Sequence, residues 1–166
     1  MKVGSMRAMT EPAPQGYPRR IIRPLGSLYG ALEPFALPMI RVTAGLLLVP
    51  HGCQKLFAWF GGRGLEATGQ YFASMGMTPG LFWATLVALT EFVGGLCLAL
   101  GLLTRPAAAA IAIFMAVAVF QVHLPNGFFW TDKGFEYPLM WGIVAFAFVI
   151  LGGGRYSVDA RVGREF

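Results

Sequence analysis

The stretch PFALPMIRVTAGLLLVPHGCQKLFAWF, from Pro34 to Phe60, decides how the rest of the chain is interpreted. It is apolar and long enough to cross a bilayer, because about 20 helical residues that rise about 1.5 Å each span the ~30 Å hydrocarbon layer. It nevertheless contains Arg41, His51 and Lys55, which a helix places on one stripe. Because a charge at membrane depth costs a few kcal/mol or more, we expect this stripe to face protein or water.

The composition of the whole chain is that of an integral membrane protein. Of its 166 residues, 56% are hydrophobic and 13% are charged, whereas soluble domains are about a quarter charged. The net charge of +5 does not indicate a nucleic-acid partner, because the basic residues lie at the ends of apolar spans rather than in one patch. Cys53 and Cys97 lie at predicted depths roughly 20 Å apart, so we expect no disulfide between them.

Three further apolar segments complete a predicted bundle of four membrane-spanning helices. They cover about Pro79–Leu103, Pro106–Leu124 and Pro138–Leu151, and the last is so short that we expect it to begin earlier or to bend. Residues 61–78 are too polar and glycine-rich to span, but their apolar residues recur at helical spacing. The predicted fold class is therefore all-α: an integral membrane four-helix bundle with a short surface helix between the first two spans.

Charge and proline content divide the chain into three predicted parts. Residues 1–33 form a basic, mostly irregular N-terminal tail, residues 34–154 the four-helix domain and residues 155–166 a C-terminal tail. Most Lys and Arg residues lie in the two tails, while Arg63 and Lys133 lie at the opposite ends of the spans. The positive-inside rule then places both termini in the cytoplasm.

With this topology, helix rise brings three ionisable groups near one depth. His51 lies ~14 Å below the outer end of the first span and Glu91 roughly 18 Å below that of the second. Lys55 lies about one turn above His51, and Arg41 about 15 Å below it, where its side chain reaches toward Glu91 or toward the cytoplasm. We therefore expect a His51–Glu91 pair near mid-membrane.

A second polar layer is predicted at the outer surface, where the third span ends and the fourth begins. It contains His123, Asp132 and Glu136, and it predicts a vestibule that leads through Lys55 to the deeper pair. For these three residues the sequence favours an ordinary solvated rim over a functional vestibule.

The deeper residues also have structural interpretations. Glu91 can form an ion pair with Arg41 or Lys55 that fixes helix packing. His51 can bond a backbone carbonyl that Pro50 leaves free.

Protein-bound metal, haem or flavin is not expected. His51 and His123 are the only histidines, and their predicted heights differ by roughly 12 Å or more, too far for one haem iron. No set of three or four ligands has the spacing of a zinc site, and no glycine-rich phosphate loop follows a strand.

The motifs of the first two spans carry a family resemblance. They are His51-Gly-Cys-Gln-Lys-Leu-Phe57, Phe60-Gly-Gly-Arg-Gly64, Met75-Gly-Met77 and Glu91-Phe-Val-Gly-Gly95, with Gly101-Leu-Leu-Thr-Arg105, His123, Glu136, Gly152–Gly154 and Ser157-Val-Asp159 further on. This pattern, from about Pro38 to Asp159, resembles the DoxX family of small four-helix bacterial membrane proteins. The resemblance implies a multi-pass protein of the bacterial inner membrane and a link to membrane redox systems that use quinones.

The first functional hypothesis is a membrane-embedded subunit of a quinone- or quinol-linked redox system. Quinone reduction takes two electrons and two protons, so His51 and Glu91 suit proton delivery and Lys55 suits stabilisation of a developing oxyanion. The candidate catalytic residues are His51, Lys55 and Glu91, and the candidate quinone-binding residues are Arg41, His51, Lys55, Phe57, Glu91, His123 and Glu136. Since the sequence carries no flavin, haem or iron–sulfur motif, we expect partner subunits to supply the electrons.

The second hypothesis is a non-enzymatic scaffold or assembly subunit of a larger complex, or a conduit for a small anion. The basic stripe of Arg41, His51 and Lys55 attracts an anion, and ridges of small residues favour contact with partner helices. The sequence leaves open whether the chain is an enzyme.

Overall fold

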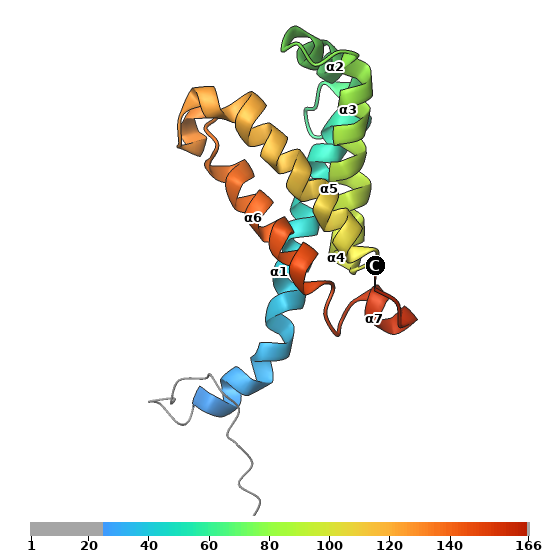
Figure 1. The fold of residues 1–166 in the computed structure, drawn as a ribbon, viewed down its shortest axis with the longest axis vertical. Helices are drawn as coiled ribbons and strands as arrows, with labels where there is room; N and C mark the ends of the chain where they lie inside the picture. Colours follow the sequence, from blue (N-terminus) through green and yellow to red (C-terminus); the bar gives the residue numbers. More distant parts are fainter. Residues whose placement is uncertain (1–24, 166) are drawn as a thin grey trace, which may run out of the picture. The chain divides into compact units, whose positions relative to one another are not determined.

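In the computed structural model, which describes residues 25–165, every regular element is a helix. The chain divides into two units, Met1–Glu33 and Pro34–Phe166, and the second contains all the candidate site residues. The α-helices are α1 (Leu25–Leu56), α2 (Gly64–Ser74), α3 (Gly80–Leu89), α4 (Gly95–Leu100), α5 (Thr104–Val117), α6 (Glu136–Leu151) and α7 (Val158–Val162) (Figure 1). Two π-helical segments, η1 (Thr90–Gly94) and η2 (Ala118–His123), continue α3 and α5, and two short 3₁₀ turns, η3 (Leu124–Asn126) and η4 (Trp130–Asp132), follow.

Within residues 25–165, three helical runs are long and apolar enough to cross a membrane: Leu25–Leu56, Gly80–Leu100 and Thr104–Asn126. Large apolar side chains on their surfaces are exposed in the isolated chain, among them Met39 at 66% and Ile113 at 67%. Such exposure is expected of side chains that face lipid. The prediction of an all-helical membrane protein is confirmed.

Helix α1 differs from its prediction at both ends. It begins at Leu25 rather than at Pro34, so Leu25–Glu33, assigned to the irregular tail, is helical. A proline inside a helix removes one backbone donor without necessarily ending the helix. At the other end α1 stops at Leu56, because Ala58 and then Phe60 adopt positive φ angles of 56° and 51°. The remainder of the predicted tail, residues 1–24, lies outside the described residues.

The other predicted helices lie close to their expected positions. The fourth apolar segment begins two residues early, at Glu136, as its short length suggested. The third begins at Thr104, two residues before its predicted start. The expected short helix between the first two spans is α2, which packs on α3 where Gly69 and Gly80 meet backbone to backbone.

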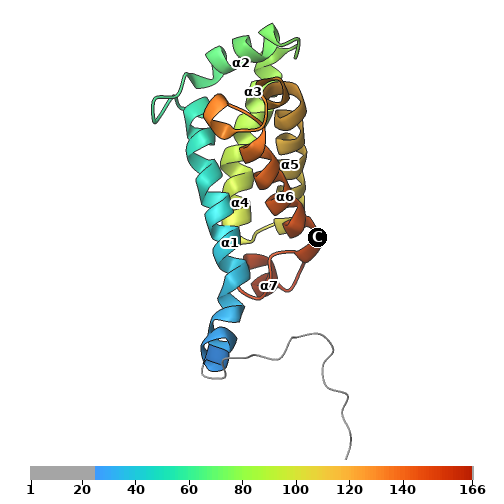
Figure 2. The same ribbon diagram turned by 90° about the vertical axis from the view of Figure 1, so that its left-hand side faces the viewer.

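Small residues let α1 approach the Gly80–Leu100 run closely. A Cβ atom at Gly52 would lie 2.6 Å from the backbone nitrogen of Phe92, and a Cβ at Gly45 would collide with the carbonyl of Gly95. Helices α5 and α6 run side by side, as both Figure 1 and Figure 2 show. Helices α1, α4, α5 and α6 together supply the buried core, which consists of Ala44, Leu48, Leu98, Ala108, Ile111, Met115, Ala145 and Phe148.

Residues 155–165, predicted as a tail, are folded against the bundle through Asp159. The Asp159 carboxylate accepts hydrogen bonds from the backbone nitrogens of Leu103 and Thr104, at 2.8 and 2.9 Å, and from the Thr104 hydroxyl at 2.7 Å. Leu103 precedes α5 and gives that helix no side-chain cap. Asp159 therefore caps α5 from a distant part of the sequence.

Candidate functional site

A cavity of about 830 Å³ opens among α1, α2, α3, α5, α6 and the two π-helical segments. Most of its wall is apolar, and it includes Leu47, Leu48, Phe72, Val87, Phe114, Met115 and Ala118. Polar or amphipathic side chains also line it: His51, Lys55, Arg63, Thr68, Tyr71, Glu91, His123, Tyr137 and Trp141. An apolar cavity with a few convergent polar groups is the usual form of a small-molecule site.

An ion pair between Lys55 and Glu91 forms one side of this cavity. The Lys55 Nζ atom lies 2.8 Å from Oε1 and 2.6 Å from Oε2 of Glu91. The side chain of Glu91 is 6% exposed and that of Lys55 is 23% exposed. The pair forms because Gly52, one turn before Lys55, lets α1 approach Phe92, the neighbour of Glu91.

Both π-helical segments place an ionisable side chain in the cavity wall. Glu91 belongs to η1, and His123 is the last residue of η2. A π-helical insertion changes the direction in which the following side chains point, and such segments are frequent at functional sites. The sequence predicts neither segment, because a uniform α-helical period gives no sign of an inserted residue.

The expected His51–Glu91 pair is wrong, and the alternative ion pair of Glu91 with Lys55 is the one that forms. His51 lies one turn below Lys55 on the same wall and is exposed to the cavity. Both carboxylate oxygens of Glu91 are bonded to Lys55, whose side chain reaches the level of Glu91 from one turn higher. Depth along the helices was estimated well enough to bring the three residues together, but not to decide which two would pair.

Of the three residues predicted in the outer polar layer, only His123 lines the cavity. Its Nδ1 lies 2.6 Å from the carbonyl oxygen of Lys133. Glu136 instead accepts a hydrogen bond from the backbone nitrogen of Trp130, at 3.1 Å. Asp132 is exposed in η4, and neither acid belongs to the cavity wall.

Phe57, predicted as a quinone-binding residue, lies outside the cavity wall. Its ring packs edge-on against Phe92 at 5.7 Å and beside Trp59 at 5.0 Å. It is therefore placed to support η1 from behind rather than to touch a molecule in the cavity.

Arg41 lies away from the cavity, in a different polar cluster. It is 2% exposed and donates to the carbonyl oxygens of Leu98, at 3.3 Å, and of Tyr156, at 2.9 Å. Its Nε has no partner among the described residues. We call Arg41, Thr104, Ser157 and Asp159 the C-terminal clamp.

Inside the clamp, opposing effects act on the pKa of the Asp159 carboxyl. Burial by itself raises this pKa, but hydrogen bonds from Thr104 and Leu103, together with the Arg41 charge, hold it below its ordinary value. Asp159 is thus stabilised as a carboxylate, which is the form that caps α5.

Several cavity residues were missed by the sequence analysis. Arg63 lies in the glycine-rich loop after α1, and Tyr71 follows Thr68 by three residues on one face of α2. That spacing was a usable signal, since it places both side chains toward the same neighbour. Tyr137 and Trp141 lie four residues apart near the start of α6, a second signal of the same kind.

Comparison of the sequence with known proteins identifies the family of this chain. The profile of the DoxX family matches residues 36–124 of the 166, more than half of the chain. A Bacillus subtilis protein named "Putative oxidoreductase CatD" is 30% identical over 61% of this chain and 69% of its own length. The inner membrane protein YqjF of Escherichia coli is 30% identical over 81% of this chain and 98% of its own.

A membrane protein of Mycobacterium tuberculosis is 30% identical over 95% of both chains. No solved structure matches. The profile match begins inside α1 and extends past the end of η2, so it includes both residues of the Lys55–Glu91 pair. On this profile match and on relatives that share nearly the full length, the chain belongs to the DoxX family.

Proposed function

We propose that this protein is a membrane subunit of a quinone- or quinol-linked redox system, and that its cavity binds the quinone ring. The observation that carries the proposal is a nearly buried ion pair, Lys55–Glu91, in the wall of a largely apolar cavity. A quinone ring is apolar on its faces and has two carbonyl oxygens that need hydrogen-bond donors. The oxidoreductase name of the Bacillus subtilis relative supports the same class of chemistry.

The proposed topology has four spans, with α6 as the fourth and both termini in the cytoplasm of a bacterial cell. Helix α6 has 16 residues, about 24 Å at helical rise, and packs along α5. Its outward side chains Ile143 and Ile150 are 62% and 61% exposed, as expected against lipid. Relatives named as inner membrane proteins support the bacterial inner membrane as the location.

In the proposed mechanism Lys55 donates a hydrogen bond to one ring oxygen of the quinone, and Glu91 transfers protons to the reduced ring. Lys55 has three N–H donors; two are directed to Glu91, and its remaining contact, to the His51 carbonyl, is long at 3.5 Å. A ring oxygen can therefore take the third donor without breaking the ion pair. The Lys55 charge also stabilises negative charge that develops on that oxygen.

Protons reach the site from the outer end of the cavity in this proposal. His123 and His51 line the same cavity as Glu91, and an imidazole ring can both accept and donate a proton. A bound quinone accepts two electrons and two protons when it is reduced. Since the sequence has no flavin, haem or iron–sulfur motif, the electrons come from a partner subunit.

A scaffold role is the second candidate, and one observation favours it. The Lys55–Glu91 pair joins α1 to η1 beside the close contact at Gly52, so the same two charges can serve only to fix helix packing. An anion conduit is less well supported, because Leu48 and Met115 at the floor of the cavity belong to the packed core.

The variant Glu91→Gln separates the two candidates. We expect the purified variant to assemble normally but to lose the thermal stabilisation that a short-chain ubiquinone gives the parent protein. Glu66→Gln, an exposed acid on α2 outside the cavity wall, is the matched control and should behave like the parent. Loss of folded protein or of complex assembly in Glu91→Gln would support the scaffold. A parent protein that contains no quinone and gains no stability from it would overturn the redox proposal.

A further inference from the structure

The segment after α6 is held at the junction of two apolar helical runs. The backbone nitrogen of Asp159 donates to the carbonyl of Gly101 at 2.9 Å, and its carboxylate caps the start of α5. Gly101 lies in the turn between Gly80–Leu100 and Thr104–Asn126, both long and apolar enough to cross a membrane. A turn between two spans lies at the membrane surface, so the attached segment lies there too.

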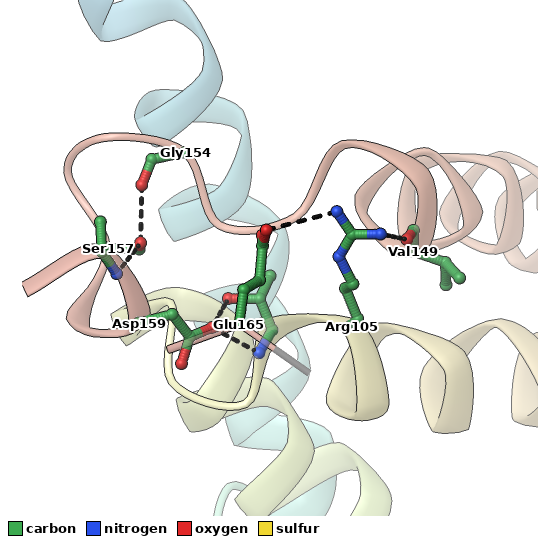
Figure 3. Close-up of polar contacts among 8 residues, drawn as sticks. Arg105, Val149, Gly154, Ser157, Asp159 and Glu165 are labelled. Atoms are coloured by element: carbon green, nitrogen blue, oxygen red, sulfur yellow. Dashed lines mark hydrogen bonds and ion pairs between the residues drawn. The ribbon is translucent and has the colours of Figure 1, made fainter. Parts of the chain in front are cut away.

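This segment presents positive charge that no described acid neutralises. Arg155, Arg161 and Arg164 are exposed, and neither ion pair of the described residues includes them. Of the two acids in the segment, Asp159 is 6% exposed inside the clamp. The other, Glu165, pairs with Arg105 at 3.3 Å, as Figure 3 shows.

Apolar and aromatic side chains stand among these arginines. Tyr156 is 42% exposed and Val162 64% exposed. The Tyr156 ring stacks on Phe35 at 5.4 Å with an angle of 9° between the planes, and the Arg155 guanidinium lies 4.9 Å from the Tyr156 ring centre. Tyrosine beside arginine is the composition of a membrane–water interface, where the ring lies at headgroup level and the charge reaches the phosphates.

We propose that residues 155–165 form a docking surface for the phosphate groups of anionic phospholipids in the leaflet at this end of the bundle. Two features carry this inference: exposed guanidinium groups, whose geometry suits bidentate hydrogen bonding to phosphate, and a clamp that fixes their backbone at the bilayer surface. A flexible tail would lose conformational entropy on each contact, whereas a folded segment has already lost it. The inference does not depend on quinone binding.

Native mass spectrometry of the protein, purified in detergent and mixed with equal amounts of phosphatidylglycerol and phosphatidylcholine, tests this surface. We expect the parent to retain phosphatidylglycerol preferentially. The variant Arg155→Gln/Arg161→Gln/Arg164→Gln should lose at least tenfold of that preference, since one basic residue near a bilayer surface contributes about a factor of five. The corresponding triple lysine variant keeps the charge and should retain most of the preference.

Single changes and a soluble anion complete the test. Arg161→Gln should weaken the preference, whereas Lys133→Gln, an exposed cation in the loop before α6, should not. Inorganic phosphate at millimolar concentration should not displace the lipid. A parent without lipid preference, a triple glutamine variant that keeps it, or full competition by phosphate would each overturn the proposal. Unfolding temperature and helical circular dichroism show that each variant is folded.

Discussion

Helix α1 places two cations, Arg41 and Lys55, inside the bundle, and their surroundings differ. Arg41 is 2% exposed in the C-terminal clamp, close to Asp159, whose carboxylate accepts three hydrogen bonds from α5 and the residue before it. Lys55 is paired with Glu91, but both are in the wall of a cavity of about 830 Å³. One cluster is closed by the protein itself, and the other faces space that a second molecule can occupy.

The difference shows that burial of charge alone does not identify a functional site. In the clamp, backbone groups of Gly101, Leu103 and Thr104 bond Asp159, so its position is determined several times over. Glu91 has its hydrogen bonds from the single side chain of Lys55. We therefore expect changes in the clamp to act on stability, and changes at the cavity to act on binding.

The largest effect is expected from Asp159→Asn. The amide places an N–H donor among groups that are themselves donors and removes the charge that Arg41 faces. We expect the free energy of unfolding to fall by about 3 kcal/mol, as when one partner of a buried charged network is removed. Unfolding by sodium dodecyl sulfate in mixed micelles measures it, with Asp132→Asn in the exposed η4 turn as control. Equal losses of unfolding free energy in the two variants would show that the clamp contributes no more to stability than an exposed turn does.

Protonation of Asp159 should reproduce part of that loss. Burial raises the pKa of Asp159, but hydrogen bonds from Thr104 and Leu103 and the Arg41 charge leave it below its ordinary value. A depressed folded-state pKa means that the stabilisation is complete above the unfolded-state value, about 3.9, and is lost as the pH falls through the lower folded-state value. The unfolding temperature of the parent should therefore decline below about pH 4 more steeply than that of Asp159→Asn. Parallel curves would contradict the assignment.

An intermediate effect is expected where α1 meets η1 at the cavity. In Gly52→Ala the new Cβ would lie 2.6 Å from the Phe92 nitrogen, so the helices must separate. Overpacking of this kind costs about 2 kcal/mol and also moves Lys55 away from Glu91. Gly94→Ala is the matched control on η1, since its Cβ would meet Ile111 at 3.7 Å, an ordinary contact. The control should unfold like the parent, and a Gly52→Ala protein that also does so would rule out close packing here.

Replacing the charged pair itself should cost less than replacing the clamp. Lys55→Met leaves the Glu91 carboxylate beside a cavity that water can enter, so we expect a loss of about 1 kcal/mol in the free energy of unfolding. The double variant Lys55→Met/Glu91→Met should recover most of it, because paired apolar replacements remove the charge that the single change leaves unpaired. The same mixed-micelle unfolding measures all three proteins. A double variant less stable than either single variant would mean that the ion pair itself stabilises the packing of α1 against η1.

Much of the cavity site could be predicted from the sequence, because the apolar length of a span and the position of a residue along its helix are local properties. Apolar length located the spans, and helix rise placed His51, Lys55 and Glu91 near one depth. The pairing of Lys55 with Glu91 depends on the close contact at Gly52 and on the π-helical turn at Glu91, and neither follows from a uniform α-helical period. The cavity itself arises from tertiary packing around those residues.

The clamp could not be predicted, because its partners are far apart along the chain. Asp159 is separated from Leu103 and Thr104 by 56 and 55 residues, and Tyr156 from Arg41 by 115. The sequence showed a short, arginine-rich end, which is typical of a solvated tail. The missing signal was that Leu103, just before α5, offers that helix no side-chain cap, so that an acid from elsewhere is needed.

The smallest effect is expected from Arg105→Gln, at the edge of the clamp. Arg105 reaches Glu165 at 3.3 Å and the Val149 carbonyl at 3.4 Å, as Figure 3 shows, but the two charged side chains are 38% and 45% exposed. Exposed ion pairs typically contribute about 0.2–1 kcal/mol and many contribute nothing measurable, so the variant should lose about 0.5 kcal/mol or less of unfolding free energy. Glu165→Gln should do the same, and 0.5 M salt should erase the difference from the parent. If either change instead cost as much as Asp159→Asn, the clamp would extend to the end of the chain, and its strength would not come from the buried bonds of Asp159 alone.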